Sequence, residues 1–363
     1  MGSTKFITAI LKEGRNVKLS PNQAGASDDA AIEASSSSSG KAGVLHPFWV
    51  IVRKEIGDHV RSWRYIVLLA LMALTCIGSL YAAIQGIRHP DADTQQTNDL
   101  LGDAFVFLKL FTESNGTLPP FITFVSFIGP LLGIGLGFDA VNAERGKGTL
   151  SRLMSQPIHR DYVINGKFVG ALAVISAMFA ALVFMMLGVG LVVTGIQPSP
   201  EEFWRMMLFL VLSICYVAFW LNLAIVFSIR FRQAATSALT CIAIWIFFSV
   251  FYSMIIDLIG SSTYPGDAAS TSDLISHTQW MQFLMRLSPG QLFSEATSTL
   301  LTPSVRNLGP LTMDQVIGAI PSPLPLSQSI LLVWPQVTAL IALTAICFGL
   351  SYALFMRQEI RSR

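Results

Sequence analysis

Residues 144–160, ERGKGTLSRLMSQPIHR, form a strongly charged segment between two long apolar runs. The run before it covers residues 120–138, the run after it covers residues 168–193, and both contain almost no charge. Apolar runs of about 20 residues are long enough to cross the hydrocarbon core of a bilayer as helices. The sequence therefore predicts a membrane hairpin with the charged segment as the loop at its mouth.

The composition indicates an integral membrane protein. Hydrophobic residues make up 52% of the 363 residues and charged residues only 13%, against the ~25% charged residues usual in soluble domains. A net charge of +2 is too small to indicate a nucleic-acid partner. The cysteines and histidines lack the spacing of a metal or disulfide site. We therefore predict no metal, no cofactor and no catalytic residue in this chain.

Six apolar segments predict an all-α polytopic fold with six transmembrane helices. Each segment is close to the ~20 residues that cross a bilayer. The gap between the fourth and fifth segments is narrow, but Arg230 and Arg232 are too costly for the middle of a bilayer and indicate a tight turn there. The predicted spans are residues 65–87, 120–141, 163–195, 204–229, 234–259 and 329–356.

Two segments precede the six-helix transmembrane domain, which covers residues 65–363. Residues 1–45 are poor in large apolar side chains, which predicts a flexible cytoplasmic tail. Residues 46–64 interleave apolar and basic residues at helical spacing, which predicts an amphipathic helix along the inner membrane interface. The helix has two interpretations, a plain juxtamembrane element or a surface that contacts a partner.

The predicted outside loops are unequal in length. Residues 101–111 are apolar but interrupted by charge, which predicts a short amphipathic helix and not a span. The loop over residues 260–328 is much longer than typical connections. Within it, residues 280–301 predict a helix or helix pair split at Ser288-Pro289-Gly290. This part could dip into the outer leaflet if protein neighbours satisfy its backbone.

The distribution of Lys and Arg predicts the orientation. If both termini are cytoplasmic, nineteen of the 24 Lys and Arg residues lie in inside segments. Such an excess of positive charge is typical of cytoplasmic loops. We therefore expect a multi-pass protein of the cell (plasma or inner) membrane, with residues 144–160 inside. The five remaining residues are Arg88, Lys109, Arg205, Arg286 and Arg306.

The second span contains glycines at every fourth position, Gly129, Gly133 and Gly137. Glycines stacked on one helix face allow another helix to approach closely. We favour packing within the chain over a dimer contact. The alternative is that these glycines and Pro130 make a kinked span that moves during a transport cycle.

The spans themselves carry little chemistry. We find no Lys, Arg, His or Glu well inside any of them, and Asp139 and Asp257 lie at span ends. Intramembrane proteases and proton-driven pumps would need ionisable groups near mid-depth. Gly146-Lys147-Gly148-Thr149 lacks the first glycine and the hydroxyl position of a phosphate-binding loop. ATP-driven work would therefore need another subunit.

The charged loop follows the pattern E-x-x-x-G-T-L-x-x-L-x-x-x-P-x-x-R. Together with the interfacial helix, the tight second inner loop, the long loop before the last span and the basic C-terminus, this pattern resembles the type-2 class of ATP-binding cassette (ABC) transporter permeases. The resemblance covers residues 46–363 and is nearest the nitrous-oxide-reductase-maturation and gliding-motility permeases. The pattern residues are Glu144, Gly148, Thr149, Leu150, Leu153, Pro157 and Arg160.

The resemblance implies a dimer of six-span subunits bound to two cytoplasmic ATPase subunits, which hold ATP and Mg²⁺. It also implies that the charged loop is a coupling helix seated in a groove of the ATPase. Leu150 and Leu153 would supply an apolar face there, and Arg145 would supply charge beside it. Cargo would then cross by alternating access, along the second and fifth spans.

Two other functions compete with the permease. A secondary carrier would need internal repeats or buried coupling charges, which the sequence does not display. A membrane scaffold or assembly factor would instead use the long outside loop, residues 260–328, to recruit partners.

Overall fold

The computed structural model describes residues 46–88, 105–114, 116–149, 159–264, 270–303 and 323–357. The chain divides into two units, residues 1–46 and Pro47–Arg363, and all the described helices belong to the second. The predicted cytoplasmic tail lies outside the described residues. Every regular element in the described ranges is a helix, and none is a strand. The predicted all-α fold is therefore confirmed.

The described residues contain six helices that are long and apolar enough to cross a membrane, as predicted. The fifth is built from three consecutive elements with a π-helical turn, η1, in the middle, which the sequence analysis does not predict. The elements that form the spans are α4 (Trp63–Arg88), α7 (Phe121–Gly137) with α8 (Asn142–Gly146), α10 (Arg160–Thr194), α11 (Pro200–Arg230), α12 (Ala234–Ile246) with η1 (Phe247–Phe251) and α13 (Tyr252–Thr263), and α17 (Leu326–Met356).

The fourth span starts earlier than predicted, at Pro200 instead of residue 204. The reason is a capping box. The Ser199 hydroxyl accepts a hydrogen bond from the backbone N–H of Glu202, and the Glu202 carboxylate accepts one from the backbone N–H of Ser199. These two bonds satisfy donors that a helix start otherwise leaves unpaired, so the polar residues join the helix.

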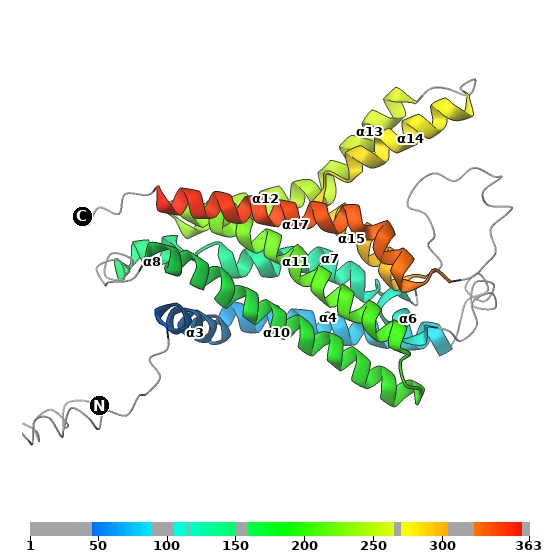
Figure 1. The fold of residues 1–363 in the computed structure, drawn as a ribbon, viewed down its shortest axis with the longest axis horizontal. Coiled ribbons are helices and arrows are strands. Elements are labelled where there is room, and N and C mark those ends of the chain that lie inside the picture. Colours follow the sequence, from blue (N-terminus) through cyan, green and yellow to red (C-terminus); the bar gives the residue numbers. More distant parts are fainter. Residues whose placement is uncertain are drawn as a thin grey trace, which may run out of the picture. The chain divides into compact units, whose positions relative to one another are not determined.

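Helix α11 is the centre of the bundle. It packs against α7, α10, α12, α15 (Pro289–Leu301) and α17 (Figure 1). Many of its large side chains, including Phe209, Tyr216 and Trp220, are buried. One end of the bundle carries α3 (Pro47–Val60), α8, the α11–α12 turn and the end of α17, and we call it the α8 end (Figure 1). The other end carries α6 (Val106–Thr112) and the α10–α11 turn, and we call it the α6 end.

The three glycines of α7 lie on the face that packs against α11. A Cβ atom at Gly133 would lie 2.7 Å from the backbone oxygen of Val217, and one at Gly137 would lie 2.8 Å from that of Leu221. At Gly129 the nearest atom is a methyl group of Val217, at 3.1 Å. The two helix backbones are therefore in direct contact, within one chain, and any larger side chain at Gly133 or Gly137 would separate them.

Arg205 holds the α6 end together. The sequence places it among the outside charges, at the outer end of the fourth predicted span, but the structure buries its side chain completely. Its guanidinium donates to the backbone oxygens of Leu300 (2.7 Å) and Leu324 (2.5 Å) and forms an ion pair with Glu201 (2.9 Å). A buried charge needs such partners. Arg205 therefore joins α11 to the end of α15 and to the segment that leads into α17.

The described parts of the predicted outside loops contain three helices besides the ends of the spans. Helix α6 is shorter than predicted, and its side chains Phe107, Leu108, Leu110 and Phe111 are buried in the bundle. Residues 280–301 divide between α14 (Thr271–Met285) and α15, with Pro289 as the first residue of α15. In Figure 1, α14 lies beside α13, and α15 lies beside α17, which α15 contacts.

The α7–α11 contact leads to a prediction about stability. Gly133→Ala places a methyl group against backbone atoms of α11 that cannot move aside, so we expect it to destabilise the fold by about 1–3 kcal/mol. The matched control is Gly188→Ala in α10, where the added Cβ would meet nothing within 4 Å. Alanine there should be neutral or stabilise by about 0.5–1 kcal/mol, because it favours the helix more than glycine does.

Thermal unfolding of the purified protein in detergent measures both changes. Gly133→Ala should melt below the wild type, and Gly188→Ala at or above it. Equal melting temperatures for the two variants would contradict the close contact between α7 and α11.

Candidate functional site at the junction of α3, α8 and α10

The structure describes both ends of the predicted coupling loop. Glu144 and Arg145 lie in α8, Gly148 and Thr149 follow it, and Arg160 is the first residue of α10. Gly148 has a positive φ of 67° with open space around it, and the Thr149 hydroxyl donates to the backbone oxygen of Glu144 at 3.2 Å. The other predicted coupling residues, Leu150, Leu153 and Pro157, lie outside the described residues.

The start of α8 is fixed to α11. The backbone N–H groups of Val141, which precedes α8, and Asn142, its first residue, both donate to the hydroxyl oxygen of Ser228, at 2.9 and 3.3 Å. The side-chain amide of Asn142 donates to the backbone oxygen of Phe138 at 3.2 Å. These bonds satisfy backbone donors at the beginning of a helix, which would otherwise be unpaired. The position of α8 is therefore set by the central helix of the bundle.

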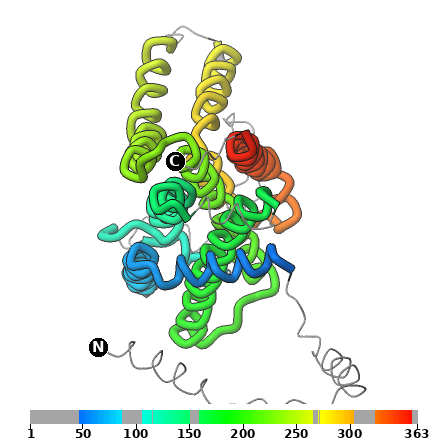
Figure 2. Tube along the Cα trace, turned by 90° about the vertical axis from the view of Figure 1, so that its left-hand side faces the viewer, coloured from blue at the N-terminus to red at the C-terminus, as the bar shows by residue number. Residues whose placement is uncertain are grey.

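Helix α3 runs crosswise over α10 at the α8 end (Figure 2). Gly166 and Gly170, one turn apart on α10, make room for it. A Cβ at Gly166 would lie 2.7 Å from a methyl group of Ile51, and one at Gly170 would lie 2.8 Å from the Cβ of Glu55. The predicted helix over residues 46–64 thus exists as α3, followed by a turn before α4. Its placement along the membrane interface stays a prediction.

A cluster of paired charges joins α3, α8 and α10. Lys167 of α10 is buried, with 5% of its side chain exposed. Its Nζ lies 2.8 Å from Glu144 Oε1 of α8 and 3.2 Å from Glu55 Oε1 of α3. The Nζ of Lys54 lies 3.0 Å from Glu55 Oε1, 3.3 Å from Asp58 Oδ2 and 3.6 Å from Glu144 Oε1. Two ammonium groups are therefore shared between carboxylates on two different helices.

The environment favours the charged forms of Glu55 and Lys54. Burial alone would raise the pKa of Glu55, but attraction and hydrogen bonds from Lys167 and Lys54 outweigh burial and hold it below its ordinary value. Burial would likewise lower the pKa of Lys54, but Glu55 and Glu144 raise it. Because the pKa of Glu55 is lower in the folded protein than in the unfolded chain, the ion pairs of Glu55 stabilise the fold fully at pH values above the ordinary pKa of Glu. This stabilisation is lost as the pH falls through the lowered pKa.

A second ion pair lies at the same end of the bundle. Arg64, at the start of α4, forms an ion pair with Asp139, and its guanidinium lies over the ring of Phe138, 4.9 Å from the ring centroid. Asp257, the other carboxylate that the sequence places at a span end, is exposed on α13. Among the described residues, no three His, Cys, Asp or Glu side chains come together as a metal site would need.

Sequence reasoning misses Glu55 and Lys167. It counts Lys167 only as one of the nineteen inside charges and gives Glu55 no role. One signal is available in the sequence: Lys167 lies between Gly166 and Gly170 in a run that is otherwise apolar from residue 168 onward. A lysine beside two glycines one turn apart indicates a site where another segment both approaches closely and brings a carboxylate.

The cluster predicts that the buried lysine, Lys167, stabilises the fold more than the exposed lysine, Lys54. Lys167→Met leaves the carboxylates of Glu55 and Glu144 close together without the buried cation, which should cost about 3 kcal/mol. The matched control, Lys54→Met, removes a lysine whose side chain is 55% exposed, and this should cost at most about 1 kcal/mol.

The melting temperature of the purified protein at pH 7 is the measurement. We expect a drop of roughly 5–10 °C for Lys167→Met and of at most a few degrees for Lys54→Met. If the two variants have the same melting temperature, the buried Lys167 does not hold α3, α8 and α10 together.

Comparison with known proteins agrees with the fold and with the resemblance of the loop. Residues 49–360 match the family described as ABC-2 family transporter protein. The chain is 25% identical over 217 residues to the probable ABC transporter permease protein NosY of Stutzerimonas stutzeri, covering 58% of this chain and 70% of that protein. It is 24% identical over 212 residues to the NosY protein of Pseudomonas aeruginosa, covering 57% and 68%. With six helices apolar enough to span a membrane and a family match that runs from α3 past the end of α17, this chain belongs to the ABC-2 family of transporter proteins.

Proposed function

We propose that this chain is the membrane subunit of an ABC transporter that moves its cargo by alternating access, driven by ATP hydrolysis in separate ATPase subunits. The family implies an ATPase partner and a membrane setting. In this proposal the chain has no enzymatic activity and no cofactor, and ATP and Mg²⁺ are held by the partner. The observation that carries the proposal is the charge cluster, because it connects both ends of the predicted coupling loop to the bundle.

The contacts around the loop favour a rigid transfer of motion. Glu144, four residues before Gly148, is paired with Lys167, seven residues after Arg160. The two ends of the loop are therefore linked to each other as well as to α3. On the other side, α8 is fixed to α11 at Ser228, and α7 packs against α11 backbone to backbone. A push on residues 144–160 would displace α3, α8 and the start of α10 together.

The proposed orientation places the α8 end in the cytoplasm. Within the described part of the chain, most Lys and Arg residues fall in segments at this end, which is typical of cytoplasmic loops. Helix α3 and the end of α17 lie at this same end of the bundle (Figure 1). Both termini would then be cytoplasmic, in the plasma or inner membrane, and residues 144–160 would face the ATPase.

We further propose that two copies of the chain form the transporter. The fifth span leaves many large apolar side chains uncovered within one chain, among them Leu239, Phe251 and Leu258. A second copy would cover part of this surface, and the cargo would pass between the copies along α7 and the fifth span. Phe127 of α7 already lies against Trp245 of α12, with ring centroids 4.8 Å apart, so these two spans are neighbours.

Two substitutions separate docking of the ATPase from transfer of its motion. Leu153→Asp places a charge on the predicted apolar docking face, so we expect it to abolish co-purification of the ATPase with the tagged chain. Glu144→Ala leaves that face intact but removes the pairing with Lys167. We expect the ATPase to be retained and its stimulation by the permease to fall by at least tenfold.

The measurements are pull-down after mild solubilisation and the ATP hydrolysis rate of the complex in nanodiscs. Asp58→Asn is the control for Glu144→Ala, because the Asp58 side chain belongs to the same cluster but is 64% exposed. It should leave both readouts unchanged. The proposal fails if the wild-type chain never retains an ATPase, or if Leu153→Asp retains it as well as the wild type does.

A further inference from the structure

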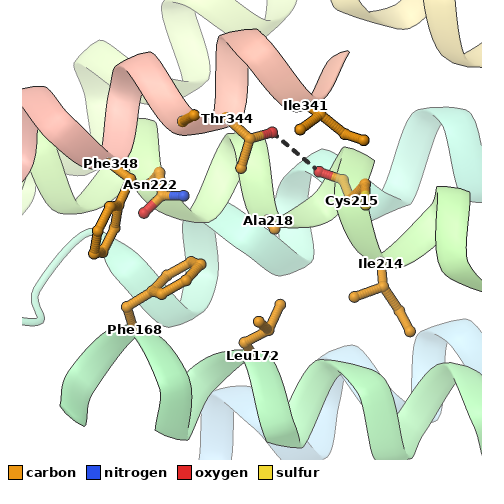
Figure 3. Close-up of a pocket in the computed structure, with 10 residues that line it drawn as sticks. Phe168, Leu172, Ile214, Cys215, Ala218, Asn222, Ile341, Thr344 and Phe348 are labelled. Atoms are coloured by element: carbon orange, nitrogen blue, oxygen red, sulfur yellow. Dashed lines mark hydrogen bonds between the residues drawn. The ribbon is translucent and has the colours of Figure 1, made fainter. Parts of the chain in front are cut away.

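A cavity of about 300 Å³ lies between α10, α11 and α17 (Figure 3). Its walls are almost entirely apolar. Phe168 and Phe348 lie on opposite helices with ring centroids 5.1 Å apart, and Leu172, Ile214 and Ile341 line the rest of the space shown in Figure 3. The cavity belongs to neither the charge cluster nor the α7–α11 contact. It is therefore a separate feature of the bundle.

Asn222 is a polar side chain in the wall of this cavity, and its hydrogen-bonding capacity is unused. The residue is fully buried, and neither its Nδ2 nor its Oδ1 has a hydrogen-bond partner within the described part of the chain. The hydroxyl of Thr344, the neighbouring polar residue in Figure 3, is close to two backbone oxygens, that of Leu340 at 2.8 Å and that of Cys215 at 3.5 Å, the latter drawn as a dashed line. Buried polar groups are nearly always paired, so an unpaired amide beside a cavity indicates a bound group that pairs with it.

The depth of Asn222 restricts what that group can be. Helix α11 has 31 residues and is about 46 Å long, so a hydrocarbon core of about 30 Å leaves about 8 Å of helix outside on each side. Asn222 lies eight residues before Arg230, or about 12 Å along the axis. With α11 centred and upright in the bilayer, the amide would lie about 4 Å inside the hydrocarbon boundary at the α8 end. This is the level where the ester groups of membrane lipids meet their acyl chains.

The cavity borders the side of the bundle that faces lipid. Ile341, which lines it, is half exposed, and further along α17 the side chain of Ile346 is 66% exposed. Exposed apolar side chains in a membrane helix contact acyl chains. A lipid chain can therefore enter sideways between α10 and α17, without crossing the bundle.

We propose that this cavity binds one ester-linked glycerolipid from the leaflet at the α8 end. The Nδ2 of Asn222 donates a hydrogen bond to an ester carbonyl of the lipid. The acyl chain below that ester lies against Phe168, Leu172 and Ile341. This inference is independent of the ATPase partner and of the cargo, since it rests only on the cavity, its unpaired amide and its depth. A side chain from a second copy of the chain is the competing occupant.

The test compares two phosphatidylcholines that differ only at the linkage. The full-length chain is purified in detergent, delipidated, and titrated with 1-palmitoyl-2-oleoyl phosphatidylcholine or with its dialkyl ether analogue, which lacks both carbonyls. Native mass spectrometry measures the affinity of the first lipid bound. Because the ester lipid can accept one hydrogen bond that the ether lipid cannot, we expect the ester lipid to bind about threefold to tenfold more tightly than the ether lipid.

Three variants assign the difference to the cavity. Asn222→Leu keeps the size of the side chain but removes the donor, so ester and ether lipids should bind equally. Leu172→Trp fills the cavity and should weaken the binding of both lipids about tenfold or more. The control Leu350→Trp, on the exposed face of α17, should bind as the wild type does. Size-exclusion profiles check that each variant is folded.

Equal affinity of the wild type for the two lipids would overturn the proposal, and this comparison needs no variant to fold. Unchanged lipid binding by Leu172→Trp would overturn it as well. If Leu172→Trp instead separated a dimer while lipid binding stayed the same, the occupant would be a second copy of the chain.

Discussion

The buried ammonium of Lys167 sets the geometry of the α8 end. A charge with 5% exposure at the edge of an apolar bundle is costly unless carboxylates reach it. Glu55 and Glu144 come from different parts of the chain, and both lie within 3.2 Å of the same nitrogen. Meeting that requirement brings α3 across α10 and holds α8 beside the start of α10. The arrangement of the loop that the family would use for coupling follows from this pairing.

Backbone contacts at glycines supply the second constraint. Inside a bilayer, helices gain little from the hydrophobic effect when they associate, so close van der Waals packing has to hold them together. Gly133 and Gly137 bring α7 onto α11, and Gly166 and Gly170 bring α3 onto α10. The charge cluster connects these two packed pairs through α8. The bundle can therefore transmit a displacement over several helices without bending at one loop.

The six spans could be predicted from the sequence because each is a long apolar run with charges at its ends, and length and hydropathy are local properties. Helix starts were harder to predict. The capping box at Ser199 and Glu202 brings polar residues into α11 that an apolar run alone would exclude. The π-helical turn at Phe247–Phe251 has no signal in the apolar pattern, because the whole segment is hydrophobic.

The site could be predicted only in part. The loop from Glu144 to Arg160 carries a recognisable pattern, so its position in the chain was available from the sequence. Its partners were not, because Glu55 and Lys167 are 112 residues apart and meet only after α3 folds over α10. The same holds for Arg205, which the sequence presents as an outside charge at the end of a span and the structure buries among the backbone oxygens of distant segments.

The proposed coupling requires Glu144 and Lys167 to act as one unit when the ATPase hydrolyses ATP. A double-mutant cycle of Glu144→Gln and Lys167→Met tests this directly, with the ATP hydrolysis rate of the permease–ATPase complex as the readout. We predict that the double variant is impaired no more than the worse single variant, which corresponds to a coupling of about 1–3 kcal/mol. If the loss of ATP hydrolysis rate in the double variant equals the product of the losses in the two single variants, the two residues act independently. This result would contradict their proposed coupling.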